Sequence, residues 1–207
     1  MPDTAVSQLE PRLQKLAANA RTALAQGHLD YVLEASAEIL KTSPGCLAVR
    51  KLQHSARVQR YREGGVWAGK TRGALARVGL ILGRHQSKPE SSLVQAEAIL
   101  ATDPLSPAGL RQLAAAAEAA DWPQTAIHAL ECLVEVSPGE VQAGIELGEA
   151  CLRVGKLREA LAAAEALVQR HPQDGAALAL LRKVSVAQTL QQGNWESGGS
   201  FREKLRE

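Results

Sequence analysis

The chain has 207 residues, a formal net charge of +2 at pH 7, 45% hydrophobic residues and only 3% aromatic residues. The near-balanced charge gives no overall attraction to nucleic acid or membranes, and no apolar run approaches the roughly 20 residues of a membrane span. Ala and Leu dominate the apolar residues. Since these residues favour helices over strands, the composition predicts an all-α fold.

The first ten residues, the cysteines and the histidines indicate the localisation of the protein and whether it binds a metal. Met1–Glu10 is polar and carries acids, so we expect no signal peptide and a cytoplasmic, bacterial-type protein. The three cysteines, at 46, 132 and 151, lack metal-ligand spacing and are predicted to be small buried apolar side chains, with a zinc site or catalytic thiol as the alternative. The five histidines form no i, i+4 pair. We therefore expect no metal and no cofactor.

Three helices are predicted near the N-terminus, within residues 1–63. Thr4–Gln26 and Leu29–Lys41 form a pair that ends before Pro44, because proline cannot continue a helix. Cys46–Tyr61 forms the third helix. Its buried edge is expected to consist of Val49, Leu52 and Ala56, which have helical spacing.

A glycine-rich segment, residues 64–73, interrupts the helical pattern. Gly64–Thr71 matches the phosphate-loop pattern G-x-x-x-x-G-K-[ST], in which glycine amides, Lys70 and Thr71 would hold a nucleotide and its magnesium. Such a loop follows a buried strand, whereas Arg57–Glu63 is basic and amphipathic. We therefore predict a loop between helices, with nucleotide binding as the alternative.

Basic residues accumulate around this loop, opposed only by Glu63. They are Arg50, Lys51, Arg57, Arg60, Arg62, Lys70, Arg72, Arg77 and Arg84. The favoured interpretation is a solvated helix face followed by a loop. The alternatives are a contact for an acidic partner surface, or a nucleic-acid site in which Tyr61 and Trp67 stack on bases.

The strongest pattern is a repeat with a period of 34 residues. Laying Pro107–Glu140 over Val141–Asp174 pairs Leu113 with Leu147, Ala126 with Ala160, Leu133 with Leu167, and Pro138 with Pro172. Each unit reads as a helix, a short turn, a second helix and a proline stop. The spacing of Gly27, Ile39 and Pro44 repeats that of Gly155, Leu167 and Pro172. Before these units, Thr71–Arg84 and Pro89–Thr102 are predicted as a degenerate helix pair, with Ser87 as an N-cap.

These residues resemble the tetratricopeptide repeat (TPR) family. The best unit keeps the family's Leu-Gly pair, turn glycine, small residue in the second helix and closing proline, at Leu147, Gly148, Gly155, Ala160 and Pro172. The preceding unit is looser, with Ala114 in place of the glycine and Asp121-Trp122-Pro123 in its turn. The resemblance implies an all-α, right-handed α-solenoid of antiparallel helix hairpins.

The repeat also predicts how the helices pack. Gly148 and Ala160 would let the two helices of a hairpin approach closely, and Trp122 would plug a turn. The apolar stripe is expected to contain Leu147, Cys151, Leu157, Leu161, Ala164 and Leu167. The expected organisation is N-terminal helices in 1–63, the loop 64–73, a solenoid in 74–192 closed by a capping helix over Asp174–Gln191, and a flexible tail in 193–207.

The resemblance places partner binding on exposed residues of each first helix, which have no evident internal partner. In the two clear units these are Arg111, Gln112, Ala115, Glu118, Gln142, Glu146, Glu149 and Arg153. Three glutamates there suit a basic or mixed segment, and Ala115 and Glu149 argue against the family's carboxylate clamp. No catalytic frame is evident. We predict a non-enzymatic scaffold that binds another protein, while a merely soluble helix face is the plain alternative.

Overall fold

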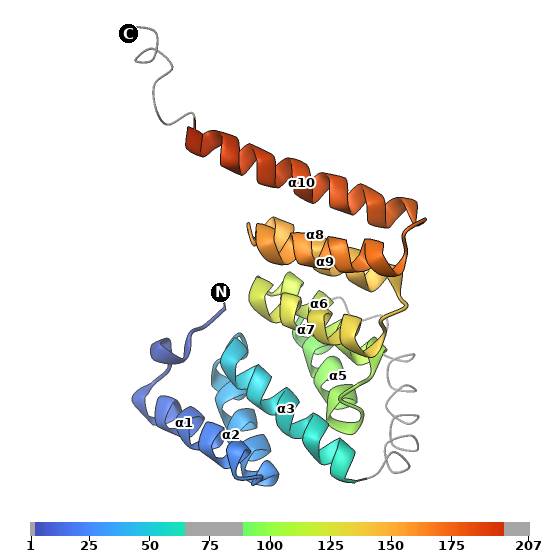
Figure 1. Ribbon diagram of the computed structural model, residues 1–207. Helices are drawn as coiled ribbons and strands as arrows, with labels where there is room; N and C mark the ends of the chain where they lie inside the picture. Colours follow the sequence, from blue (N-terminus) through green and yellow to red (C-terminus); the bar gives the residue numbers. More distant parts are fainter. Residues whose placement is uncertain (1–2, 65–88, 197–207) are drawn as a thin grey trace, which may run out of the picture. The chain divides into compact units, whose positions relative to one another are not determined.

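The computed structural model describes residues 3–64 and 89–196, and the regular structure in those ranges is helical throughout (Figure 1). Contacts between Cα atoms divide the chain into two compact units, Met1–Ser137 and Pro138–Glu207. The first unit contains the 3₁₀ helix η1 (Val6–Gln8) and the α-helices α1 (Pro11–Ala25), α2 (Leu29–Thr42), α3 (Leu47–Glu63), α5 (Pro89–Thr102), α6 (Pro107–Ala119) and α7 (Pro123–Val136). The second contains α8 (Val141–Arg153), α9 (Leu157–Arg170) and α10 (Gly175–Glu196). Within the first unit α1 packs against α2, α2 against α3, α5 against α6, and α6 against α7; within the second unit α8 packs against α9 and α9 against α10. The helical structure of the described residues confirms the predicted all-α class.

The predicted period is visible in the helix bounds. The helices α8 and α9 begin and end 34 residues after α6 and α7. Four helices, α2, α5, α7 and α9, each have 14 residues, and each is followed by a four-residue connector whose second residue is proline. The residue before that proline is extended in φ, at −133° for Ser43 and Ser137 and −132° for His171, because proline excludes its predecessor from the helical region.

The turn inside each hairpin repeats as well. Its middle residue has a left-handed backbone, with φ of 80° at Gly27, 60° at Asp121 and 73° at Gly155. Glycine adopts this region without steric cost, and aspartate tolerates it better than most residues. The recurrence of the same turn and the same connector confirms the predicted helical-repeat organisation.

Small residues set the distance between helices in the second unit. A Cβ atom on Gly144 would lie 2.7 Å from Leu167 of α9, and one on Gly148 would lie 2.7 Å from Leu180 of α10. Gly148 was predicted to allow close packing between α8 and α9. This was wrong, because the nearest side chain to Gly148 is Leu180 of α10. The reason is that α8 packs against both α9 and α10 and divides its small residues between them.

The predicted apolar stripe is confirmed in part. Cys151, Ala164 and Leu167 are buried, whereas Leu147, Leu157 and Leu161 are only half-buried. All three cysteines are free and buried, as predicted.

Helix ends differ from the predictions at two places. The helix predicted over Thr4–Gln26 is divided into η1 and α1, because Pro11 starts α1 and holds Glu10 in an extended conformation. At the other end, α10 continues past Gln191 to Glu196, beyond the predicted start of the tail at Gly193. The predicted helix Thr71–Arg84 and the N-cap Ser87 lie outside the described residues.

Candidate functional site

The predicted partner-binding residues of α6 are partly engaged inside the first unit. Arg111 and Gln112 are half-buried, while Glu118 is exposed. The side-chain amide of Gln112 donates to the Ser92 carbonyl at 3.3 Å and to the Gln95 side chain at 3.0 Å. Both acceptors belong to α5, so Gln112 joins two helices of the fold.

The predicted residues of α8 also have internal partners. Gln142 donates to Glu146 at 3.1 Å, and Glu149 forms an ion pair with Lys183 of α10 at 3.0 Å. Arg153 is exposed and takes part in further interactions. The expectation that this face lacks internal partners was therefore wrong. Because α6 belongs to the first unit and α8 to the second, the two sets stay separate predictions.

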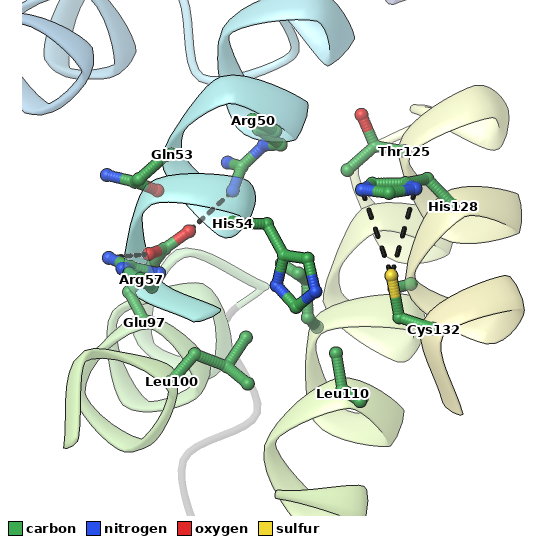
Figure 2. Close-up of a pocket in the computed structure, with 12 residues that line it drawn as sticks. Arg50, Gln53, His54, Arg57, Glu97, Leu100, Leu110, Thr125, His128 and Cys132 are labelled. Carbon is green, nitrogen blue, oxygen red and sulfur yellow. Dashed lines mark hydrogen bonds and ion pairs between the residues drawn. The ribbon is translucent and has the colours of Figure 1, made fainter. Parts of the chain in front are cut away.

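A polar cluster joins α3 to α5 and α7 in the first unit (Figure 2). We name it the Glu97 cluster, after the carboxylate that two arginines share. Arg50 contacts Glu97 Oε1 at 2.5 Å, and Arg57 contacts Oε2 at 2.7 Å. Arg50 also donates to the Pro44 carbonyl at 2.7 Å and lies over the ring of Trp122 at 5.7 Å. This ion pair fixes α3 to α5.

The Glu97 cluster changes the interpretation of the basic run. The side chain of Arg50 is only 5% exposed and that of Arg57 14%, so neither belongs to a solvated face. Arg60 is exposed but pairs with Asp30 at 2.8 Å. These acids lie far from the arginines in sequence, which is why only Glu63 was expected to oppose the run. Residues 70, 72, 77 and 84 lie outside the described part of the chain.

The remaining members of the Glu97 cluster are His54, His128 and Cys132. The two histidine rings meet edge to face with centroids 5.9 Å apart, and the Cys132 sulfur lies 3.9 Å from both ring nitrogens of His128. Figure 2 shows the His54 ring between the ion pair and the side chains of α7.

Burial makes Cys132 and His54 uncharged near neutral pH. Burial, with added repulsion from Glu135 and Glu131, raises the pKa of Cys132 to about 12. Its thiol therefore stays protonated near neutral pH and is a poor nucleophile. Burial, followed by the charges of His128 and Arg57, lowers the pKa of His54 to about 4. The cavity beside these groups has a volume of about 20 Å³, which is room for about one water molecule. Among the described residues, no three His, Cys, Asp or Glu side chains are grouped to hold a metal.

A larger, open groove lies between α1 and α3, and we call it the α1–α3 groove. Its volume is about 610 Å³, within the range of roughly 300–1,000 Å³ that is usual for ligand sites. It is lined by Val6, Gln14, Ala17, Ala18, Arg21, Thr22, Ala48, Val49, Lys51, Leu52 and Ser55.

The sequence shapes this groove through small residues on its walls. Ala18 and Ala48 are exposed, so no bulky side chain fills the space between the two helices. The Gln14 side chain donates to the carbonyls of Ser7 and Leu9 at 3.1 and 2.8 Å, and it thereby holds η1 at the edge of the groove. No sequence motif marks this groove, since the clearest repeats lie in residues 107–172.

The phosphate-loop match begins where α3 ends. Gly64 is the C-cap of α3, and residues 57–63 are the last turns of that helix. The predicted absence of a strand before the loop is therefore confirmed, whereas residues 65–71 lie outside the described ranges. Within residues 3–64 and 89–196, every helix is too short or too polar to span a membrane.

The fold and its turns define a helical-repeat protein. No family model matches the chain. No curated protein matches it. Among solved structures, it is similar to one titled "Crystal structure of MamA protein", with 16% identity, a TM-score of 0.44, and coverage of 89% of this chain and 86% of that chain.

Proposed function

We propose that this chain is a degenerate TPR-type interaction module that holds a segment of another protein in the α1–α3 groove. The observation that carries the proposal is the groove itself, an open volume of about 610 Å³ between α1 and α3. A groove of this size accepts several side chains of a bound segment. The module would act by binding and not by catalysis.

The lining suits a protein segment. Ala17 and Val49 are buried in its floor, while Arg21, Lys51 and Ser55 are exposed around it. An apolar centre with a polar rim is the usual arrangement of a protein interface. Affinity should be modest, because desolvation and ordering of the segment offset much of the contact energy.

The exposed residues predicted on α6 and α8 form a second proposed contact surface. They are Arg111, Gln112, Glu118, Gln142, Glu146, Glu149 and Arg153. We favour the α1–α3 groove over them, because Gln112, Gln142, Glu146 and Glu149 already interact within their own units.

Site-specific photo-crosslinking in the native host tests the proposal. A photo-reactive amino acid is placed at Ala18 or Ala48 in the groove, and at Glu34, which is exposed on α2 outside the groove lining, as the matched control. We expect one protein to be captured from both groove positions and not from Glu34. Filling the groove with Ala48→Trp should abolish that capture from Ala18.

Two results would contradict the proposal. Equal capture from Glu34 would mean that the contact is not specific to the groove. Capture from Arg111 and Glu149, with none from Ala18 or Ala48, would move the binding surface to α6 and α8.

A further inference from the structure

We propose that the segment held in the α1–α3 groove is acidic and aliphatic, with carboxylates placed next to short apolar side chains. This inference rests on the proposed function and adds the chemistry of the partner. It depends on the distribution of charge between helices, on the pairing of those charges, and on the composition of the groove lining.

Charge is separated between the helices that form the groove and the helix behind them. Residues 11–25 of α1 and 47–62 of α3 contain no Asp or Glu, although they contain several Arg and Lys. Glu10 directly precedes α1 and Glu63 ends α3; the other acids between Pro11 and Glu63 all lie on α2, at Asp30, Glu34 and Glu38. The walls of the groove are therefore basic, whereas the intervening helix is acidic.

Most of the arginines of α1 and α3 lie outside the groove lining and already form ion pairs. Arg12 pairs with Glu38 at 2.8 Å, Arg60 pairs with Asp30, and Arg50 and Arg57 share Glu97. Each of these pairs uses an acid from outside the groove lining.

Two cations remain in the lining itself. Arg21 of α1 and Lys51 of α3 are exposed on the two walls, and within the described ranges no carboxylate forms an ion pair with either. An acidic segment would supply the missing counter-charges, and complementary charges favour and speed such an encounter.

The rest of the lining separates a protein partner from a nucleic acid. Single-stranded nucleic acid usually stacks its bases on aromatic side chains, and the groove lining contains none. Ala17, Val49 and Leu52 instead give a floor that buries aliphatic groups. A protein segment with carboxylates that pair with Arg21 and Lys51, and with apolar side chains between them, would match both the two cations and the aliphatic floor.

The first experiment uses defined probes on the full chain. A fluorescein-labelled peptide of alternating Glu and Val is compared with the same peptide carrying Gln for Glu, with one carrying Ser for Val, and with labelled oligo-dT. We expect the Glu-Val peptide to bind at least about tenfold more tightly than either peptide control. Equal binding of the Gln peptide, no binding of the Glu-Val peptide, or tighter binding of oligo-dT would overturn the inference.

Charge reversals then locate the site. Arg21→Glu with Lys51→Glu should raise the Kd for the Glu-Val peptide about tenfold or more. The matched control is Lys15→Glu with Arg62→Glu, which makes the same change of net charge on the same two helices but outside the lining. It should change the Kd by about twofold or less at moderate salt. Equal loss in both pairs would overturn the inference, because only total charge would then matter.

Two further variants distinguish lost binding from impaired folding, and failure of this inference from failure of the proposed function. Arg21→Gln with Lys51→Gln serves if the reversals impair folding, and it should weaken binding in the same direction. Ala48→Trp separates the inference from the proposed function. If it abolishes capture of the crosslinked partner while the charge reversals leave that capture unchanged, the groove binds a partner that is not acidic. If neither change affects capture, both proposals fail.

Discussion

His54 lies half-buried on α3, with the ring of His128 edge-on at 5.9 Å and the charge of Arg57 nearby. These surroundings lower its pKa to about 4, from an ordinary value of 6.5. Between these two values the unfolded chain binds a proton that the folded chain does not. The free energy of unfolding should therefore fall as the pH drops from about 6.5 to about 4, and this contribution should be constant above and below that window.

The prediction is tested by urea unfolding at several pH values. His54→Gln should flatten the loss of stability across this window, because glutamine does not titrate. His28→Gln is the matched control, since His28 is exposed in the turn between α1 and α2. An unchanged slope in His54→Gln would show that other groups cause the acid sensitivity.

Residue-scale predictions succeeded where they concerned the kind of role and not the identity of the partner. Trp122 was predicted to plug a turn, and it does pack there: a Cβ atom on Gly45 would lie 2.9 Å from its ring, and Arg50 lies over it. Asp3 shows the opposite case. Its carboxylate accepts from the amides of Gln124 and Thr125 at 2.7 and 3.2 Å, and so caps α7 from the far end of the sequence. No local pattern could reveal that contact, nor the pairing of Arg50 with Glu97.

At the scale of elements, the left-handed turn inside each hairpin predicts that replacing Gly155 and replacing Gly139 by alanine have different effects on stability. Gly155 has φ of 73° and Gly139 has no positive φ, yet a Cβ atom would meet nothing within 4 Å at either position. Gly155→Ala should therefore cost about 1–2 kcal/mol from backbone strain alone. Gly139→Ala should be neutral or slightly stabilising, because it restricts the unfolded chain.

Urea unfolding with an unchanged slope on denaturant measures both effects. Equal stability of the two variants would mean that the turn relaxes away from the left-handed backbone when Gly155 is replaced.

Elements could be predicted where the sequence repeats. The second helices and their proline connectors follow from period and spacing, and the prediction for Pro89–Thr102 agrees with α5 residue for residue. The N-terminal helix was predicted to begin too early. Proline is favoured at the first position of a helix, and α1 begins at Pro11. The α1–α3 groove escaped prediction for a different reason. A groove depends on which side chains are small on two separate helices, and Ala18 and Ala48 look unremarkable in sequence.

At the scale of the whole molecule, contacts separate Met1–Ser137 from Pro138–Glu207. The 34-residue period continues across this division. A repeat in sequence predicts the helices and turns of each hairpin, but it does not predict how two hairpins pack against each other. The sequence therefore suggested one continuous set of hairpins over residues 107–172. Within the first unit, the Glu97 cluster joins α3 to α5 and α7, so its loss should affect the unit as a whole.

Glu97→Gln tests this role of the Glu97 cluster. The substitution keeps the shape of the side chain but leaves Arg50, whose side chain is 5% exposed, without a carboxylate. Removing one partner of a buried ion pair typically costs about 3–5 kcal/mol, because the other charge stays buried. Glu38→Gln is the matched control: its partner Arg12 is 80% exposed, so the loss should stay below about 1 kcal/mol.

Urea unfolding gives the two free energies, and hydrogen exchange read by mass spectrometry shows where protection is lost. In Glu97→Gln, amides of α3 and α5 should exchange faster, whereas those of α8 and α9 should change little because they belong to the other compact unit. A cost as small as that of Glu38→Gln would mean that water solvates Arg50 once its carboxylate is gone. Equal loss of protection in α8 and α9 would mean that the two units unfold together, and that the Glu97 cluster stabilises the entire chain.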